Sequence, residues 1–386
     1  MNVLFLIYTG RHGQGGHLHS LNTISRKIAE GHDVKVVTIG RKICAVLEEN
    51  PYFDSHIYSG GASSFFVPLK VMRKCRSGRF DIIHCFDYPS FYYASFSDLM
   101  QSITIVNRCG GPNPLKSPYV RKLIVFSEEN ERWFKKKSPK SQVVVVPNRV
   151  EKREPSYYLK RNILTSWDSF VFIRTCRISE AYRKSILDSC RLVEELSLLS
   201  NRKVKLLLVG DIQSKSLFEY VSTMDVVKKG MVELITDEEL TKETAKHLNV
   251  ADAIIGVGRS AAEAAALSKP VLAIDSSGRI PVLLSTESQW KCALRTNVSE
   301  RNKFRAEDQR KNLELILRMI SDDAYYNAIS KLSFKFFSSF YSSELILDKY
   351  SKFYHSDCVA EKPGLKDSFK RIYGLAKQIF NDFFKR

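Results

Sequence analysis

The stretch at residues 251–275, ADAIIGVGRSAAEAAALSKPVLAID, predicts a strand, a glycine-containing turn, a helix and a second strand in succession. The helix is expected to begin near Ser260, so free N–H groups and the positive end of its dipole face the loop at 256–260. Such a helix start can bind an anion, and Glu263, one turn inside, can reach a group bound there. We therefore expect a phosphorylated ligand such as a nucleotide at this loop. The alternative interpretation is an ordinary strand–turn–helix in which the glycines only permit tight packing.

Length and composition indicate a globular protein with two domains of ordinary size. The chain has 386 residues, of which 44% are hydrophobic and 26% charged, which is enough for two cores and excludes a disordered chain. Its net charge of +18 favours an anionic partner such as a phosphorylated substrate, an anionic lipid or a nucleic acid. No nucleic-acid-binding motif is found, so nucleic acid is not expected as a partner.

The cysteines and the apolar runs indicate a cytoplasmic protein. Eight cysteines occur singly, without the paired spacing of a zinc site, so reduced thiols and no structural metal are expected. The apolar run at 3–8 lacks a basic flank and a cleavage site, which favours a buried first strand over a signal peptide. No apolar run approaches the roughly 18 residues of a transmembrane helix.

Apolar strand runs alternate with helical patterns along most of the chain. Near-continuous apolar strands separated by helices are typical of parallel sheets covered on both faces. The predicted fold class is therefore α/β, with two doubly wound, Rossmann-like domains and a ligand cleft at the carboxyl ends of their strands. The predicted strands are 3–8, 33–39, 81–85, 103–107, 123–126 and 143–146 in the first half, and 170–175, 204–210 and 271–274 in the second.

The turn at Pro147-Asn148 and the polar stretch after it place the domain boundary at residue 150. The first domain is predicted to span 1–150 and the second 151–340. Residues 341–358 are predicted to form a helix that returns toward the first domain, and residues 359–386 a basic amphipathic tail.

A glycine-rich loop at 10–16 follows the first predicted strand, and Gly15, Gly16 and His17 lie where it enters the next helix. Its amides can hold a phosphate or admit a substrate closely; a merely tight turn is the alternative. The glycine spacing is not that of a dinucleotide fingerprint, and no acid ends the second strand, so NAD is not expected.

His84 and Asp87 lie at and just after the end of the strand at 81–85. Polar groups at the end of a parallel strand are expected to point into the ligand cleft. Either residue can act as a base or stabilise positive charge on a sugar carbon. The alternative is a satisfied polar pair that only ends the strand.

Four cations, Arg174, Arg177, Arg183 and Lys184, cluster after the first strand of the second domain. Their position near the anion-binding helix start suits a diphosphate, since Arg offers paired donors and Lys a point charge. A solvated helix start is the alternative interpretation.

Two basic segments carry interleaved apolar residues. The first, at 70–79, contains five Lys and Arg residues. The second is the tail at 365–386, where six cations and two acids lie opposite one apolar helical stripe, formed by Leu365, Phe369, Ile372, Ala376, Ile379, Phe380 and Phe383. This composition fits a helix lying in an anionic bilayer surface. Packing back onto the first domain is the alternative.

The order and spacing of these segments resemble the retaining glycosyltransferases of family four, which have the GT-B fold of two facing Rossmann-like domains. The resemblance covers residues 2–355 and is carried by Gly15-Gly16 and by residues 30–38, 80–84, 125–128, 146–151, 176–178, 208–211, 251–252 and 263–271. It points to a divergent subgroup that builds bacterial surface polysaccharides.

The resemblance implies a donor site in the second domain, formed by Arg177, Arg183, Lys184, Gly258, Arg259, Ser260 and Glu263. The cations would hold the diphosphate of the nucleotide sugar, Glu263 the ribose, and the amides at 258–260 a phosphate or the sugar. The first domain would bind the acceptor beside Gly15 and Gly16. No metal or cofactor is implied, since the nucleotide sugar is a substrate.

The function expected on this basis is transfer of a sugar from a nucleotide-sugar donor, with retention of configuration, to a lipid-linked or polysaccharide acceptor. The protein is expected on the inner face of the cell membrane, held by residues 70–79 and 365–386. Two alternatives remain: a sugar-nucleotide epimerase with the same fold, and an inactive GT-B scaffold at the membrane.

Four positions depart from the family pattern. Ile255 stands where a glutamate is usual, Phe86 replaces a histidine, Tyr182 a lysine and Arg149 a glycine. The missing glutamate keeps the inactive alternative open.

Overall fold

The computed structural model describes residues 1–10, 15–95, 103–108, 110–112, 118–152, 169–237, 240–241, 244–304, 309–356 and 364–384. Residues 11–14 of the glycine-rich loop and the last two residues of the tail therefore lie outside the described residues. The chain divides into two compact units, the first made of Met1–Arg149 with Ser343–Arg386, and the second of Val150–Ser342.

Unit 1 is built on a seven-stranded parallel sheet in the order β3-β2-β1-β4-β5-β6-β7. Its strands are β1 (Asn2–Gly10), β2 (Asp33–Gly40), β3 (Phe53–Tyr58), β4 (Ile82–Cys85), β5 (Ile103–Arg108), β6 (Lys122–Val125) and β7 (Gln142–Val145). The order reverses between β1 and β4, which is the switch point where doubly wound folds bind ligands.

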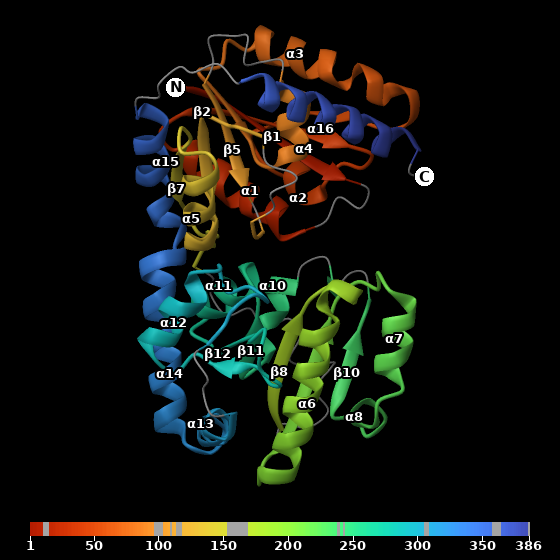
Figure 1. The fold of residues 1–386 in the computed structure, drawn as a ribbon. Helices are drawn as coiled ribbons and strands as arrows, with labels where there is room; N and C mark the ends of the chain where they lie inside the picture. Colours follow the sequence, from red (N-terminus) through yellow and green to blue (C-terminus); the bar gives the residue numbers. More distant parts are fainter. Residues whose placement is uncertain are drawn as a thin grey trace. The chain divides into compact units, whose positions relative to one another are not determined.

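Helices cover both faces of this sheet (Figure 1). They are α1 (Gly16–Ile28), α2 (Ala45–Glu48), η1 (Gly61–Phe66), α3 (Val67–Ser77), α4 (Tyr88–Ala94), α5 (Glu128–Lys137), η7 (Ser343–Leu345), α15 (Ile346–His355) and α16 (Leu365–Phe384). One core packs beneath α1 and α15, and the other beneath α3, α4 and α16. The last two helices thus complete unit 1 although they follow unit 2 in the sequence.

Unit 2 repeats the architecture with six strands in the order β10-β9-β8-β11-β12-β13, of which only β13 is antiparallel to its neighbour. The strands are β8 (Ser169–Thr175), β9 (Lys203–Val209), β10 (Val232–Ile235), β11 (Ala253–Gly256), β12 (Val271–Ala273) and β13 (Val282–Leu283). Here the switch point lies between β8 and β11. The predicted α/β fold class, two doubly wound units with a C-terminal amphipathic helix, is confirmed.

Two layers of helices enclose the second sheet. They are η4 (Glu180–Tyr182), α6 (Arg183–Leu199), α7 (Lys215–Ser222), α8 (Asp225–Lys228), α10 (Thr244–His247), η5 (Leu248–Val250), α11 (Arg259–Ala266), α12 (Glu287–Leu294), α13 (Gln309–Ser321), α14 (Asp323–Phe336) and the π-helical turn η6 (Phe337–Tyr341). The predicted helix–strand alternation of residues 251–275 appears as β11, α11 and β12.

A buried lysine ties the end of α15 to the sheet of unit 1. The ammonium of Lys122, in β6, donates to the carbonyl oxygens of Phe353 at 2.7 Å, Tyr354 at 3.2 Å and Ser356 at 2.6 Å. These carbonyls belong to the last turn of the helix, where a cation also meets the negative end of the dipole. The side chain is fully buried, so its charge is held by this helix end.

Replacing Lys122 with Met is expected to destabilise unit 1 by about 2–4 kcal/mol, because the helix carbonyls lose their donor inside the protein. Hydrogen exchange of the α15 amides in urea measures the effect. Lys205→Met is the matched control: Lys205 also lies in a strand but pairs at 2.6 Å with the exposed Glu233, so its loss should cost under about 1 kcal/mol. Equal protection of α15 in both variants would contradict this role of Lys122.

Candidate functional site

The switch point of unit 2 collects the residues expected to bind a nucleotide. Strand β8 ends at Thr175, and the loop after it leads through Arg177 to α6, while β11 leads through a glycine turn to α11. Because β8 and β11 are neighbours in the sheet, both loops emerge at the same carboxyl edge. The cations and the helix start therefore lie on adjacent connections.

The glycine turn before α11 allows close packing of the strand on the helix and leaves the start of the helix without a side-chain cap. A Cβ on Gly256 would lie 2.7 Å from the Cα of Ala261, so only glycine allows the strand and the helix to approach this closely. Gly258, the N-cap, has a φ of +57°, a conformation that favours glycine. The Ser260 hydroxyl accepts the N–H of Val257 at 2.9 Å and donates to its carbonyl at 3.1 Å. Packing thus explains Gly256, whereas α11 still begins with no side-chain cap.

Glu263 is held by the arginine one turn before it. The Nε of Arg259 donates to Oε1 of Glu263 at 2.8 Å, and both side chains are largely buried. A carboxylate oriented in this way has remaining lone pairs and can accept a ligand hydroxyl. The pair places one charge of each sign at the start of α11.

Three exposed cations follow β8, and each has a partner within unit 2: Arg177 lies in the loop, and Arg183 and Lys184 begin α6. The Arg177 guanidinium lies over the Tyr182 ring, 5.6 Å from its centroid. Arg183 pairs with Glu180 at 3.2 Å. The Lys184 ammonium bonds Asp188 and also the carbonyl oxygens of Asp275 at 3.1 Å and Gly278 at 2.7 Å. Arg177 also donates from Nη2 to the Tyr182 hydroxyl at 3.2 Å. Binding a diphosphate would require Lys184 to exchange its acceptors, whereas Arg177 would give up only exposed contacts with Tyr182.

Arg174 is used differently from the other cations. It is fully buried, and its Nη2 bonds the carboxylate of Glu300 at 2.7 Å and the hydroxyl of Ser185 at 3.1 Å. The Ser185 hydroxyl also bonds Glu300, at 2.6 Å. This cluster neutralises Arg174 inside the unit and fixes the loop around Glu300. Sequence reasoning missed Glu300, which lies in a polar run at 299–302 with no motif to mark it.

The switch point of unit 1 holds the candidate acceptor residues. Gly15, with a φ of +145°, is the N-cap of α1, and Gly16 and His17 form its first turn. Asp87 caps α4, accepting the N–H of Ser90 at 2.7 Å and that of Tyr8 at 3.0 Å. Burial raises the pKa of Asp87, and the charge of His17 lowers it in part, as do these N–H donors. The structure therefore brings His17 and Asp87 into electrostatic contact at one edge of the sheet.

His84 lies inside β4 and does not reach the solvent at this edge. It is fully buried, with Nε2 2.7 Å from Oδ1 of Asn107 and Nδ1 2.9 Å from the Tyr354 hydroxyl. Burial lowers the pKa of His84 to about 4, against a weaker opposite effect of Asn107. A general base must reach the proton it removes, so this setting favours the alternative of a satisfied polar pair. A catalytic role of His84 stays a prediction.

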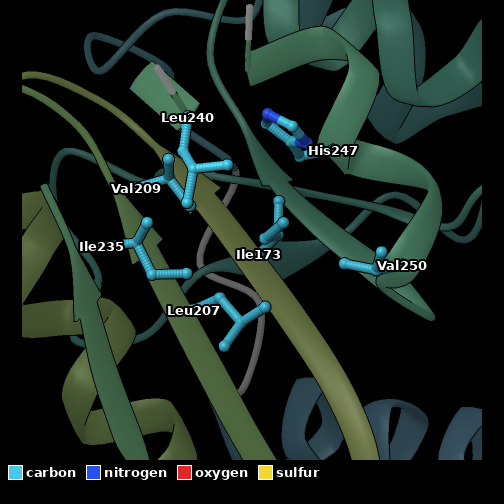
Figure 2. Close-up of a pocket in the computed structure, with 7 residues that line it drawn as sticks. All are labelled: Ile173, Leu207, Val209, Ile235, Leu240, His247 and Val250. Carbon is cyan, nitrogen blue, oxygen red and sulfur yellow. The ribbon is translucent and has the colours of Figure 1, made fainter. Parts of the chain in front are cut away.

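The small pocket in Figure 2 is not suited to an anion. Its lining side chains come from β8, β9, β10 and the segments at 240–250, and six of the seven are aliphatic: Ile173, Leu207, Val209, Ile235, Leu240, His247 and Val250. An apolar hollow of this kind belongs to core packing rather than to phosphate binding.

Comparison with solved structures identifies the fold. HepE of Anabaena in complex with UDP and glucose matches with a TM-score of 0.65 and 15% identity, over 91% of this chain and 98% of that one. The lipopolysaccharide outer core galactosyltransferase WaaB matches with a TM-score of 0.57 and 14% identity, over 91% and 98% of the two chains. UDP-GlcNAc 2-epimerase of Neisseria meningitidis, bound to UDP-GlcNAc, matches with a TM-score of 0.58 and 13% identity, over 91% and 100%.

No protein-family model matches the chain, and neither does any curated protein sequence. Each structural match covers nearly the whole length of this chain and of the matched chain. The similarity therefore includes both Rossmann-like units. The chain therefore has the GT-B fold.

The depressed pKa of His84 predicts a loss of stability in acid. Its usual pKa is 6.5 and its folded pKa about 4, so between these values the unfolded chain binds a proton that the folded chain does not. Unfolding should become easier by up to about 3 kcal/mol as the pH falls from 6.5 to 4. Urea unfolding across this range, compared with a His84→Gln variant, isolates the contribution because every other titrating group is shared. Identical slopes in the two proteins would contradict the assignment.

Proposed function

We propose that this protein is a glycosyltransferase that moves a sugar from a nucleotide-sugar donor to a lipid-linked or polysaccharide acceptor, with retention of anomeric configuration. The observation that carries the proposal is the pairing, at one carboxyl edge of unit 2, of exposed cations after β8 with the uncapped start of α11. Solved proteins of the same fold have UDP or UDP-sugars bound. Surface-polysaccharide assembly is the setting in which such an acceptor is made.

The donor is proposed to bind at the switch point of unit 2. Arg177, with Arg183 or Lys184, would hold the diphosphate, and the amides of residues 258–260 would meet a phosphate or the sugar. For this, the N–H of Gly258 would exchange its bond to the Val298 carbonyl at 2.8 Å, and that of Ser260 its bond to the Val257 carbonyl at 3.3 Å. Glu263 would accept a ribose hydroxyl, since Arg259 already orients its carboxylate. This arrangement needs no metal, because protein cations and the dipole of α11 supply the positive charge.

The same groups can lower the barrier to transfer. When the bond between the anomeric carbon and the diphosphate breaks, negative charge grows on the leaving phosphate oxygen. Preorganised cations and a helix start stabilise that charge most strongly where it develops. Retention without a protein nucleophile then requires the acceptor hydroxyl oxygen to bond the anomeric carbon on the face from which the diphosphate leaves. The hydroxyl proton would pass to the departing phosphate oxygen, which carries the negative charge.

The acceptor is proposed to bind at the switch point of unit 1, beside Gly15, Gly16 and His17. The N–H groups of Ser90 and Tyr8 bond different oxygens of the Asp87 carboxylate. Each oxygen has a further lone pair, so the carboxylate can still accept a hydroxyl or face positive charge on a sugar carbon. A lipid-linked acceptor would place the enzyme on the inner face of the cell membrane.

Two other functions fit parts of this structure. A sugar-nucleotide epimerase is favoured by the structural match to UDP-GlcNAc 2-epimerase. An inactive scaffold is favoured by the position of Ile255, which lies inside β11 and is fully buried where related enzymes carry a carboxylate. Measuring nucleotide binding distinguishes the inactive scaffold from the two enzymes. Identifying the product formed from the nucleotide sugar distinguishes the glycosyltransferase from the epimerase.

Calorimetric titration with UDP, GDP, CDP and ADP is expected to show saturable binding of one of them. Arg177→Ala and Glu263→Ala should each weaken it by about 1–3 kcal/mol, because each removes a charge-assisted hydrogen bond to the ligand. Matched controls are Arg318→Ala and Glu314→Ala, exposed residues of α13 whose partners lie on or next to the same helix. Unchanged affinity in both site variants would refute the donor site.

The bound nucleotide sugar is expected to be hydrolysed slowly when no acceptor is present. Proton NMR should show the free sugar appearing first with the anomeric configuration of the donor, together with the nucleoside diphosphate. Loss of this reaction in Arg177→Ala links it to the site. A nucleotide sugar epimerised at one ring carbon would instead identify the epimerase, and an unchanged donor would identify the scaffold.

A further inference from the structure

The C-terminal helix α16 is docked on unit 1 through its polar side. Asp382 is buried, and its carboxylate accepts hydrogen bonds from the hydroxyls of Tyr8, Ser59 and Tyr93. Arg371 is buried as well, donating to the carbonyl of Tyr119 at 2.9 Å. These bonds hold both ends of the helix in a fixed rotation about its axis.

Gly374, which lies between Arg371 and Asp382 in α16, allows the helix to pack close to α4. A Cβ on Gly374 would lie 2.3 Å from the ring of Tyr92, so any larger residue would push α16 away. Leu375 beside it completes the buried face. Figure 1 shows α16 running along α4 in unit 1.

This rotation leaves most of the apolar stripe of α16 in solvent, whereas Ile379 and Phe383 are half-buried and Ile379 packs against the core of unit 1. Six large apolar side chains of the helix are each at least 60% exposed: Leu365, Phe369, Ile372, Tyr373, Phe380 and Phe384. An amphipathic helix that only completes a core buries its apolar side. The tail thus packs back onto unit 1, as one interpretation of the sequence expected, but does so with the opposite face.

A second element extends this exposed surface. Phe65 and Phe66 of η1 are 59% and 58% exposed, and the Phe65 ring lies 5.4 Å from that of Phe383 in α16. Together, α16 and η1 form an apolar surface, which we call the aromatic face; it consists of Phe65, Phe66 and the six exposed side chains of α16. Exposed apolar surfaces of this kind mark interaction sites.

The net charge around the aromatic face is positive. Helical spacing places Lys366, Lys370 and Lys377 along one edge of the stripe, and all three are exposed. Asp382 of α16 is buried in the core. Asp367 accepts the N–H of Tyr119 and also lies 3.6 Å from the Lys370 ammonium, so Lys366 and Lys377 carry the net positive charge of this edge. Helix α3 adds further exposed cations and has no acid. Aromatic residues beside a lysine edge are the pattern of helices that lie in anionic bilayer surfaces.

We propose that the aromatic face is the surface by which this protein lies on an anionic bilayer, with α16 in the plane of the headgroups. None of the helices in the described parts of the chain is long and apolar enough to cross a membrane. The inference extends the membrane placement of the proposed function, but it rests on unit 1 alone. Tyr8 connects the face to the acceptor site, since its hydroxyl bonds Asp382 and its N–H bonds Asp87.

Co-sedimentation of the full chain with vesicles tests the proposal. The protein is expected to bind vesicles of phosphatidylcholine with phosphatidylglycerol, and at least roughly tenfold more weakly to phosphatidylcholine alone. Phe369→Ser with Phe380→Ser should lower the partition coefficient roughly tenfold or more, because two aromatic side chains no longer enter the interface. Lys370→Glu with Lys377→Glu should do the same on the anionic vesicles only. Leu198→Ser with Leu199→Ser, at exposed positions of unit 2, should change nothing.

Three results would overturn the proposal: no binding by the unaltered protein, equal binding by the Phe369/Phe380 variant, or an unaltered protein that is a dimer without lipid while this variant is a monomer. The last would make the aromatic face an interface between two copies. Melting temperature checks that each variant is folded, and nucleotide affinity should be the same in all of them. Vesicle binding without nucleotide binding would leave the aromatic face in place and remove the donor site.

Discussion

Parallel pairing at the centre of each sheet is the constraint on which this structure depends. A parallel strand cannot return through a tight turn, so each crossover carries a helix over one face or the other. The crossovers change face between β1 and β4 in unit 1, and between β8 and β11 in unit 2. At each of these points two loops diverge at the carboxyl edge of the sheet and leave backbone groups accessible. This constraint determines where the candidate site residues lie. Asp87 and Gly15 lie at one switch point, and Arg177 and Gly258 at the other.

A buried carboxylate links the C-terminal helix to the first switch point. Asp382 arrives from the far end of the chain and receives hydroxyl donors from β1, from the end of β3 and from α4. Leaving those donors unpaired in the protein interior would cost about 1–3 kcal/mol each, so these hydrogen bonds favour the observed rotation of α16 about its axis. Its apolar stripe faces solvent as a consequence. The burial of Asp382 and the exposure of Phe369 are therefore two results of one set of hydrogen bonds.

The sequence predicted the central strands well because these are buried on both faces and consist of continuous apolar runs. It did not mark β3, β10 or β13, which are edge strands of the two sheets. β3 and β10 are only partly buried, so their runs carry polar residues, and β13 has only two residues. The amphipathic helix α16 was also predictable from its spacing. Which side of it would be buried was not, because the partners Tyr8 and Tyr93 lie hundreds of positions earlier and only the folded chain brings them together. The same holds for Glu300 and Arg174, and for the burial of His84 between Asn107 and Tyr354.

Charge balance at the second switch point bears on Ile255, the position at which the glycosyltransferases that this sequence resembles usually carry a glutamate. Ile255 lies within β11 in register with Arg174, and its side chain belongs to the core, where a carboxylate would lose its hydration without reaching solvent. The carboxylate that meets the buried guanidinium comes instead from Glu300, on another loop. Arg174 is thereby neutralised, and the surplus positive charge of this edge resides on Arg177, Arg183 and Lys184, which are exposed. An anion entering from solvent meets these three side chains first, and among them only Lys184 must give up a buried carboxylate, that of Asp188, to bind it.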